Sequence, residues 1–102
     1  MKKLVLLAAG AVMALGMAPV YAADLEAGAA KYVACAACHG PTGAGQAIFP
    51  AVAGKDVDYL IEVMNKYRDG EQVGPNTALM TPHARTLSDE DIANLAAYMN
   101  SL

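Results

Sequence analysis

Both cysteines of this chain lie in one pentapeptide, Cys35-Ala36-Ala37-Cys38-His39, and this motif constrains the fold more than any other feature. Two sulfurs three residues apart on a helical turn can each bond one of the two vinyl groups at the edge of a haem, with the next imidazole beneath the iron. That imidazole needs an acceptor for its other nitrogen, and a backbone carbonyl of the following loop is the expected one. The motif predicts covalent haem c attached through Cys35 and Cys38, with His39 as an axial iron ligand.

Three other chemistries fit the two cysteines less well. A thiol–disulfide exchange site of the thioredoxin kind belongs to a βαβ unit, and no strand pattern precedes Cys35. A zinc site needs four ligands, and no second C-x-x-C or H-x-x-x-H is present to complete the set. A structural disulfide between residues this close would close a short, strained loop of little stabilising use. Haem attachment therefore fits the two cysteines best.

The N-terminus has the pattern of an export signal. Met1-Lys2-Lys3 is positively charged, residues 4–18 form an uncharged apolar run, and small or turn-forming residues follow. A membrane anchor needs about 20 apolar residues, and this run is shorter and interrupted by glycine. We predict a Sec-type signal peptide over residues 1–22, cleaved after Ala22. The domain over residues 23–102 would then lie in the periplasm, with no stable membrane insertion.

Without that leader the chain is acidic. The full sequence has seven Lys and Arg against ten Asp and Glu, and Lys2 and Lys3 lie in the leader. Nucleic-acid binding depends on clustered Lys and Arg, so this balance argues against nucleic acid as a partner. An acidic surface suits the basic docking patch of a protein partner. So small a domain also has a marginal hydrophobic core, which a covalently held cofactor would stabilise.

Three stretches have helical patterns. The first begins near Asp24, a plausible N-cap, and runs towards Cys35. The second follows Asp56, has an apolar stripe at helical spacing, and stops at Gly70. The third starts at Ser88, where three acidic residues favour the positive helix end. The segments 40–54 and 70–87 are rich in Gly, Pro, Thr and Asn, without any strand pattern. We expect an all-α fold of three main helices, with long loops wrapped around the haem.

The second axial ligand has to come from later in the chain. Met64 and Met99 lie on the apolar stripes, where methionine usually fills a core. Met80 lies in the segment 76–82, which we expect to be irregular, and helix packing gives it no evident role there. His83 is the other candidate and would give a bis-His site. Both methionine and histidine are known axial ligands of haem iron. We predict that Met80 is the second ligand, with His83 as the alternative.

From Asp24 to Leu102 the sequence resembles the short bacterial class I cytochromes c, both single-haem carriers and the domains of dihaem relatives. The resemblance rests on these residues: Gly28 and Tyr32 before the pentapeptide, Phe49-Pro50-Ala51-Val52-Ala53-Gly54, Met80-Thr81-Pro82, and Leu87-Ser88-Asp89-Glu90-Asp91-Ile92 with Leu95-Ala96-Ala97-Tyr98.

The resemblance implies roles for several of these residues. Gly28 would let the first and last helices cross closely, with Tyr32 and Tyr98 packed at the crossing. The carbonyl of Pro50 would accept a hydrogen bond from His39. Val52, where the family often has Leu, would line the haem pocket, and Met80 would be the distal ligand.

His/Met ligation leaves the iron no open position for a substrate, so we expect an electron-transfer protein and not an enzyme. The predicted function is that of a periplasmic one-electron carrier that docks briefly on redox-partner proteins. One alternative is a cytochrome subunit that accepts electrons from a tightly bound dehydrogenase, such as a flavoprotein that oxidises sulfide. The other is a haem enzyme of the peroxidase or gas-binding type, in which the distal ligand leaves.

Overall fold

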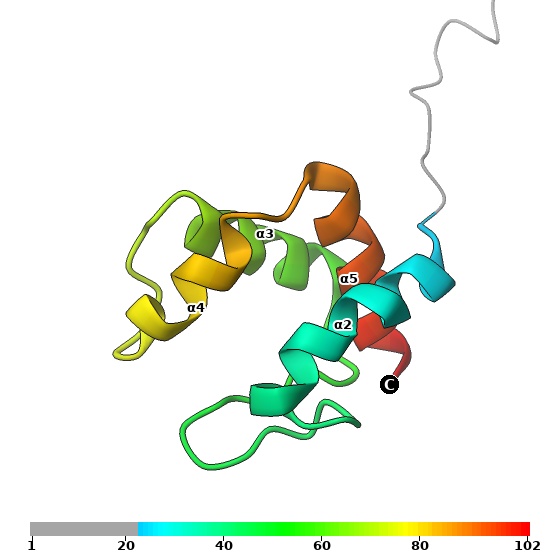
Figure 1. Ribbon diagram of the computed structural model, residues 1–102, viewed down its shortest axis with the longest axis horizontal. Helices are drawn as coiled ribbons and strands as arrows, with labels where there is room; N and C mark the ends of the chain where they lie inside the picture. Colours follow the sequence, from blue (N-terminus) through cyan, green and yellow to red (C-terminus); the bar gives the residue numbers. More distant parts are fainter. Residues whose placement is uncertain (1–22) are drawn as a thin grey trace, which may run out of the picture.

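The computed structural model describes residues 23–102, so the predicted signal peptide, residues 1–22, lies outside the described residues. The described chain forms four helices, α2 (Leu25–His39), α3 (Val57–Arg68), α4 (Thr77–Ala84) and α5 (Asp89–Ser101) (Figure 1). Over these 80 residues the structure has no strand, and only an isolated bridge joins Gln46 to Phe49. The predicted all-α fold is confirmed.

Side-chain caps fix where three of the helices begin. Asp24, Asp56 and Ser88 each accept a hydrogen bond from the backbone N–H three residues further on, at 3.0–3.1 Å. Such a cap satisfies one of the free N–H groups at a helix start. The three predicted starts are confirmed. α2 runs further than expected, through His39, so the whole pentapeptide is helical.

The cap of α5 is reciprocal. Asp91 accepts a bond from the Ser88 N–H at 3.0 Å, while its own N–H donates to the Ser88 hydroxyl. The Ser88 bond, and then Lys31 at 3.4 Å, hold the pKa of the Asp91 carboxyl below its ordinary value. A lowered folded-state pKa stabilises the fold above the carboxyl's unfolded-state pKa, and this contribution disappears as the pH falls through the folded-state pKa.

We therefore expect Asp91→Asn to lower the free energy of unfolding at pH 7, and to lower it less at about pH 3, where much of the contribution is already lost. Denaturant unfolding at both pH values measures the difference. Glu90→Gln is the matched control, because the Glu90 side chain makes no hydrogen bond or ion pair within residues 23–102. An equal loss at both pH values would contradict the linkage.

α5 is the centre of the fold, because it packs against both α2 and α3. A Cβ added at Gly28 of α2 would lie 2.2 Å from the backbone oxygen of Asn94 in α5, so only glycine permits this approach. The rings of Tyr32 and Tyr98 pack beside the crossing, with centroids 5.4 Å apart. The close crossing of the first and last helices is confirmed.

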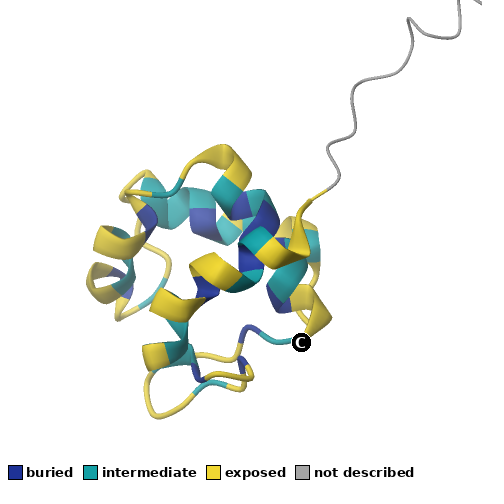
Figure 2. Ribbon diagram, turned by 45° about the vertical axis from the view of Figure 1, so that its right-hand side comes forward, coloured by how far each residue is buried: buried dark blue, intermediate teal, exposed yellow. Residues whose placement is uncertain are grey.

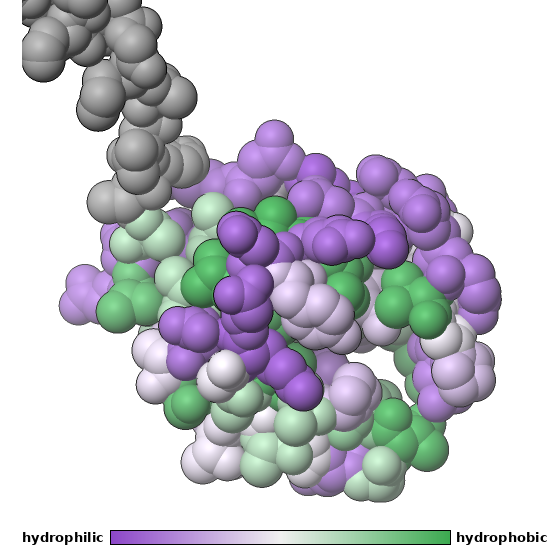
Figure 3. All heavy atoms as spheres, turned by 180° about the vertical axis from the view of Figure 1, so that it is seen from behind, coloured by the Kyte–Doolittle hydropathy of each residue, from purple (hydrophilic) through white to green (hydrophobic). Residues whose placement is uncertain are grey.

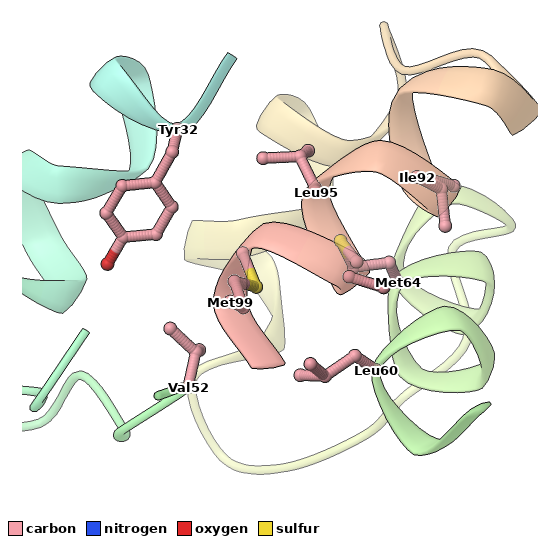
Figure 4. Close-up of a cluster of buried hydrophobic side chains, with 8 residues drawn as sticks. Tyr32, Val52, Leu60, Met64, Ile92, Leu95 and Met99 are labelled. Atoms are coloured by element: carbon pink, nitrogen blue, oxygen red, sulfur yellow. The ribbon is translucent and has the colours of Figure 1, made fainter. Parts of the chain in front are cut away.

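The hydrophobic core lies where the helices meet, and the outer helix faces and most loop positions are exposed (Figure 2). Met64 of α3 and Met99 of α5 are 4% and 3% exposed, and Figure 4 shows both among the core side chains. The prediction that these methionines fill the core is confirmed. The buried cluster consists of Tyr32, Val52, Leu60, Met64, Ile92, Leu95, Ala96 and Met99.

The segment around Met80 differs from the prediction. Residues 76–82 were expected to be irregular, but Thr77–Ala84 form a helix, α4, which packs against α3. Pro82 lies inside this helix and removes only one backbone bond, the one to residue 78. The prediction was wrong because α4 has no apolar stripe, so its stability comes from tertiary contact and not from a pattern visible in the sequence.

Candidate functional site

A cavity of about 760 Å³ lies between α2, α3, α4 and the loop 40–54; we call it the central cavity. Seen from behind, the molecule is hollowed there, with apolar residues beside the hollow (Figure 3). All six predicted site residues line it, together with two further side chains that could interact with a bound group. These eight are Cys35, Cys38, His39, Pro50, Val52, Tyr67, Met80 and His83.

The two cysteines are half-buried in the cavity wall and are not joined by a disulfide. Burial, and then the neighbouring Cys38, raise the pKa of the Cys35 thiol. A thiol–disulfide exchange site needs a lowered thiol pKa, so this environment does not favour that chemistry. Among residues 23–102, no group of three or more His, Cys, Asp and Glu side chains is arranged to hold a metal ion, which leaves the zinc alternative without support.

A hydrogen bond to the loop 40–54 orients the imidazole of His39. Its Nδ1 lies 2.7 Å from the carbonyl oxygen of Pro50. A carbonyl can only accept, so this bond puts the proton on Nδ1 and leaves the lone pair of Nε2 free to bind a metal. The edge of the Phe49 ring packs beside the imidazole, with centroids 6.4 Å apart. The hydrogen bond to the Pro50 carbonyl is the contact that the family resemblance implied, and it fixes the tautomer that iron ligation would need.

The loop 40–54 brings that carbonyl under His39. Gly45 has φ +82°, and its N–H donates to the His39 carbonyl at 2.8 Å. A Cβ at Gly45 would lie 2.7 Å from the backbone N of Ala51, so a side chain there would displace the segment beside Pro50. The N–H of Gly54 donates to the Met99 carbonyl at 2.9 Å, which ties the end of the loop to α5. The loop is therefore fixed at both ends.

Met80 and His83 lie one turn apart on α4, and both line the central cavity. Met80 is half-buried, whereas His83 is exposed. Tyr67 of α3 also reaches the cavity, and burial, followed by Tyr59, raises the pKa of its hydroxyl. The half-buried thioether that the sequence predicts as a ligand therefore lies on a helix, and not in the irregular loop expected.

The cavity fits the cofactor that the motif predicts. Its volume is typical of cofactor pockets, and its wall is mostly apolar. The Asp and Glu side chains of residues 23–102 all lie elsewhere, and the charged side chains in the wall are Lys31 and Lys55. A haem is a flat apolar ring that carries carboxylates, so an apolar wall with two lysines suits it. The wall also contains thiols, an imidazole and a thioether, the kinds of group that would attach a haem and bind its iron.

One residue near the site was missed. Thr77, the first residue of α4, is only 5% exposed, and its hydroxyl bonds the preceding turn. The sequence signal was a hydroxyl residue three after a glycine, a spacing at which Thr often bonds backbone groups. Because no helix was expected in this segment, the spacing was not recognised as the sign of a helix start.

The sequence pattern of the cytochrome c family matches residues 25–102, nearly the whole described chain. The chain belongs to the cytochrome c family. It is a short class I c-type cytochrome that carries covalently attached haem c, and electron transfer is the function of the family. No helix within residues 23–102 of this cytochrome is long and apolar enough to span a membrane.

Individual relatives agree with this assignment. Cytochrome c-554(548) of Halomonas halodenitrificans is 51% identical over 81 residues, which cover 78% of this chain and 98% of that protein. The structure of cytochrome c4 from Acidithiobacillus ferrooxidans superposes with a TM-score of 0.72 at 28% identity, over 83% of this chain and 53% of that one. The chain therefore spans about half the length of this structural relative. A protein of Stutzerimonas stutzeri named thiosulfate dehydrogenase electron acceptor is 40% identical over 65 residues, 63% of this chain and 30% of that protein.

Proposed function

We propose that this protein is a periplasmic one-electron carrier, with haem c attached through Cys35 and Cys38 and its iron bound by His39 and Met80. The observation that carries the proposal is the convergence of these four side chains on one apolar cavity. They come from two helices, α2 and α4, that are far apart in the sequence. The haem supplies a one-electron Fe(III)/Fe(II) couple.

The protein's own residues hold that couple in one environment. The Pro50 carbonyl fixes the orientation of His39 and, by accepting a hydrogen bond from its Nδ1–H, makes the lone pair of Nε2 more basic and so a better metal ligand. Val52 is 9% exposed and, with the rest of the apolar wall, would keep water from a bound haem ring. A thioether ligand raises the reduction potential because it favours the ferrous state. If His39 and Met80 both bound the iron, they would leave no position for a substrate, which supports transfer of electrons without bond chemistry.

The proposed location and domain boundaries rest on the sequence. A charged start, an apolar run and small residues before Ala23 support a signal peptide over residues 1–22 and a cytochrome domain over residues 23–102. The family match begins at residue 25, close to that boundary. Export places the chain where the covalent attachment of haem c takes place in bacteria, which supports a periplasmic carrier.

Met80→Ala tests the ligand assignment. We expect the oxidised holoprotein to lose the weak far-red absorption band that marks a methionine–iron(III) bond, because alanine offers no thioether. The ferrous form should then bind carbon monoxide rapidly, since the sixth position is open. Absorption spectra of both oxidation states, with stopped-flow mixing with carbon monoxide, measure the two effects.

Met64→Leu is the matched control, because Met64 is a buried methionine of the same cavity wall and leucine conserves its volume. It should keep the far-red band. Retention of the band by Met80→Ala would remove Met80 as the ligand. A parent protein without the band, together with a high-spin His83→Ala variant, would instead support the bis-His alternative.

The partners of the carrier are proposed as redox proteins. The similarity to a thiosulfate dehydrogenase electron acceptor favours a dehydrogenase as electron donor, although it covers only 30% of that relative. The second candidate is therefore a cytochrome subunit that stays bound to such a dehydrogenase. Elution of the native protein separates the two, because a free carrier elutes at its own mass and a subunit elutes with its enzyme.

A further inference from the structure

Thr77 closes a small hydrogen-bonded turn at the start of α4. Its hydroxyl oxygen accepts bonds from the N–H groups of Val73 at 2.9 Å and Gly74 at 2.8 Å. The same hydroxyl donates to the Gly74 carbonyl at 2.7 Å. A hydroxyl has one donor and two acceptor positions, so the turn uses all of them. Thr77 therefore holds the chain in place and has no capacity left for a bound group.

The N-terminal turn of α4 has little else to hold it. Its N-cap, Asn76, makes no side-chain capping bond, unlike the caps of the other three helices. Among the helices of residues 23–102, α4 packs only against α3. Pro82 removes one of its few backbone bonds. The start of α4 thus depends on the hydroxyl of Thr77, a residue that is only 5% exposed.

The other end of α4 is held independently. Arg68 of α3 donates to the Leu87 carbonyl at 3.1 Å and to Asp89 of α5 at 2.7 Å, so the link from α4 to α5 is tied to α3. Loss of the Thr77 bonds would consequently loosen the first turn of α4 without releasing its far end. Met80 is one turn after Thr77 and would move with it.

We propose that Thr77 is a positioning residue that fixes the first turn of α4 and so keeps the Met80 thioether at the central cavity. The proposal rests on the proposed role of Met80 as an iron ligand. It predicts that the hydroxyl of Thr77, and not merely its volume, sets how often the methionine–iron bond opens.

Thr77→Val tests this in the holoprotein, because valine keeps the shape of threonine and removes the hydroxyl. We expect a weaker far-red band and about tenfold faster carbon monoxide binding by the ferrous form, the shift in open population that loss of a buried hydrogen-bonded group produces. Thr77→Ser keeps the hydroxyl and should stay close to the parent. Thr77→Ala removes the hydroxyl together with the methyl group and adds no bulk, and it replaces the valine variant if that one does not fold.

Thr81→Val is the matched control. It removes a hydroxyl from the same helix, but Thr81 bonds only the Thr77 carbonyl, at 3.1 Å, and does not line the central cavity. Circular dichroism and the covalent haem content establish that each variant is folded and loaded. Parent-like carbon monoxide binding in folded Thr77→Val would overturn the proposal, as would an equal acceleration in Thr81→Val.

Met80→Ala, measured in the same series, separates this proposal from the ligand assignment. If Met80→Ala keeps the far-red band, Met80 is not the ligand and the role of Thr77 falls with it. If Met80→Ala loses the band while Thr77→Val behaves like the parent, only the role of Thr77 is wrong.

Discussion

Gly28→Ala should destabilise this cytochrome by about 3 kcal/mol or more, at the upper end of what overpacking costs. The new Cβ would lie 2.2 Å from the Asn94 oxygen and 2.9 Å from the Tyr98 Cβ, so α2 and α5 must separate. The better helix propensity of alanine returns only about 1 kcal/mol. Denaturant unfolding of the holoprotein measures the change.

Gly74→Ala is the matched control for that substitution. Apart from its chain neighbours, no protein atom lies within 4 Å of where its Cβ would be, and Gly74 does not have the positive φ of the turn glycines. We expect it to leave the free energy of unfolding unchanged or to raise it by about 0.4–1 kcal/mol, because alanine restricts the unfolded chain. A loss of less than 1 kcal/mol in Gly28→Ala would show that the two helices part easily.

The second large effect is expected from Cys35→Ala/Cys38→Ala. This double variant should carry no haem that resists acidified acetone, and it should show no cooperative unfolding transition. The reason is the central cavity of about 760 Å³, whose mostly apolar wall would face water without the haem. Apolar surface left in water loses stabilisation of roughly 25 cal/mol per Å². A small domain has a stability of only about 5–15 kcal/mol to lose.

The single variants Cys35→Ala and Cys38→Ala serve as controls, since each keeps one thiol for attachment. Haem staining after denaturing electrophoresis, and denaturant unfolding followed by circular dichroism, provide the measurements. Acid-resistant haem in the double variant would place the attachment elsewhere. Cooperative unfolding with parent-like stability in the haem-free double variant would show that the core forms without the cofactor.

The elements with local signals could be predicted from the sequence. Asp24, Asp56 and Ser88 mark helix starts through their own side chains, so α2, α3 and α5 were expected close to where they lie. The all-α class followed from the same patterns and from the lack of any strand pattern. α4 could not be predicted, because it has no apolar stripe and contains Pro82.

In the candidate site, too, some residues could be predicted from the sequence and others could not. The pentapeptide places its chemistry within five residues, so Cys35, Cys38 and His39 could be chosen from sequence alone. The partner of His39 could not, because the direction of the Pro50 carbonyl depends on a loop with four glycines at positive φ between residues 40 and 54. Only the family resemblance supplied that contact. The role we propose for Thr77 needed the structure, since it depends on which helices α4 does not touch.

The crossing of α2 and α5 has a consequence for how the chain folds. The N–H of Asp24 donates to the Asn94 side chain at 2.8 Å across 70 residues of sequence, so the contact at the centre of the fold is also one of the most distant along the chain. Closing so long a loop costs chain entropy, so the pairing of α2 with α5 raises the mean sequence separation of contacts, which slows folding. Among the helices of residues 23–102, α2 packs only against α5, so it gains a helix partner only when the last helix is available.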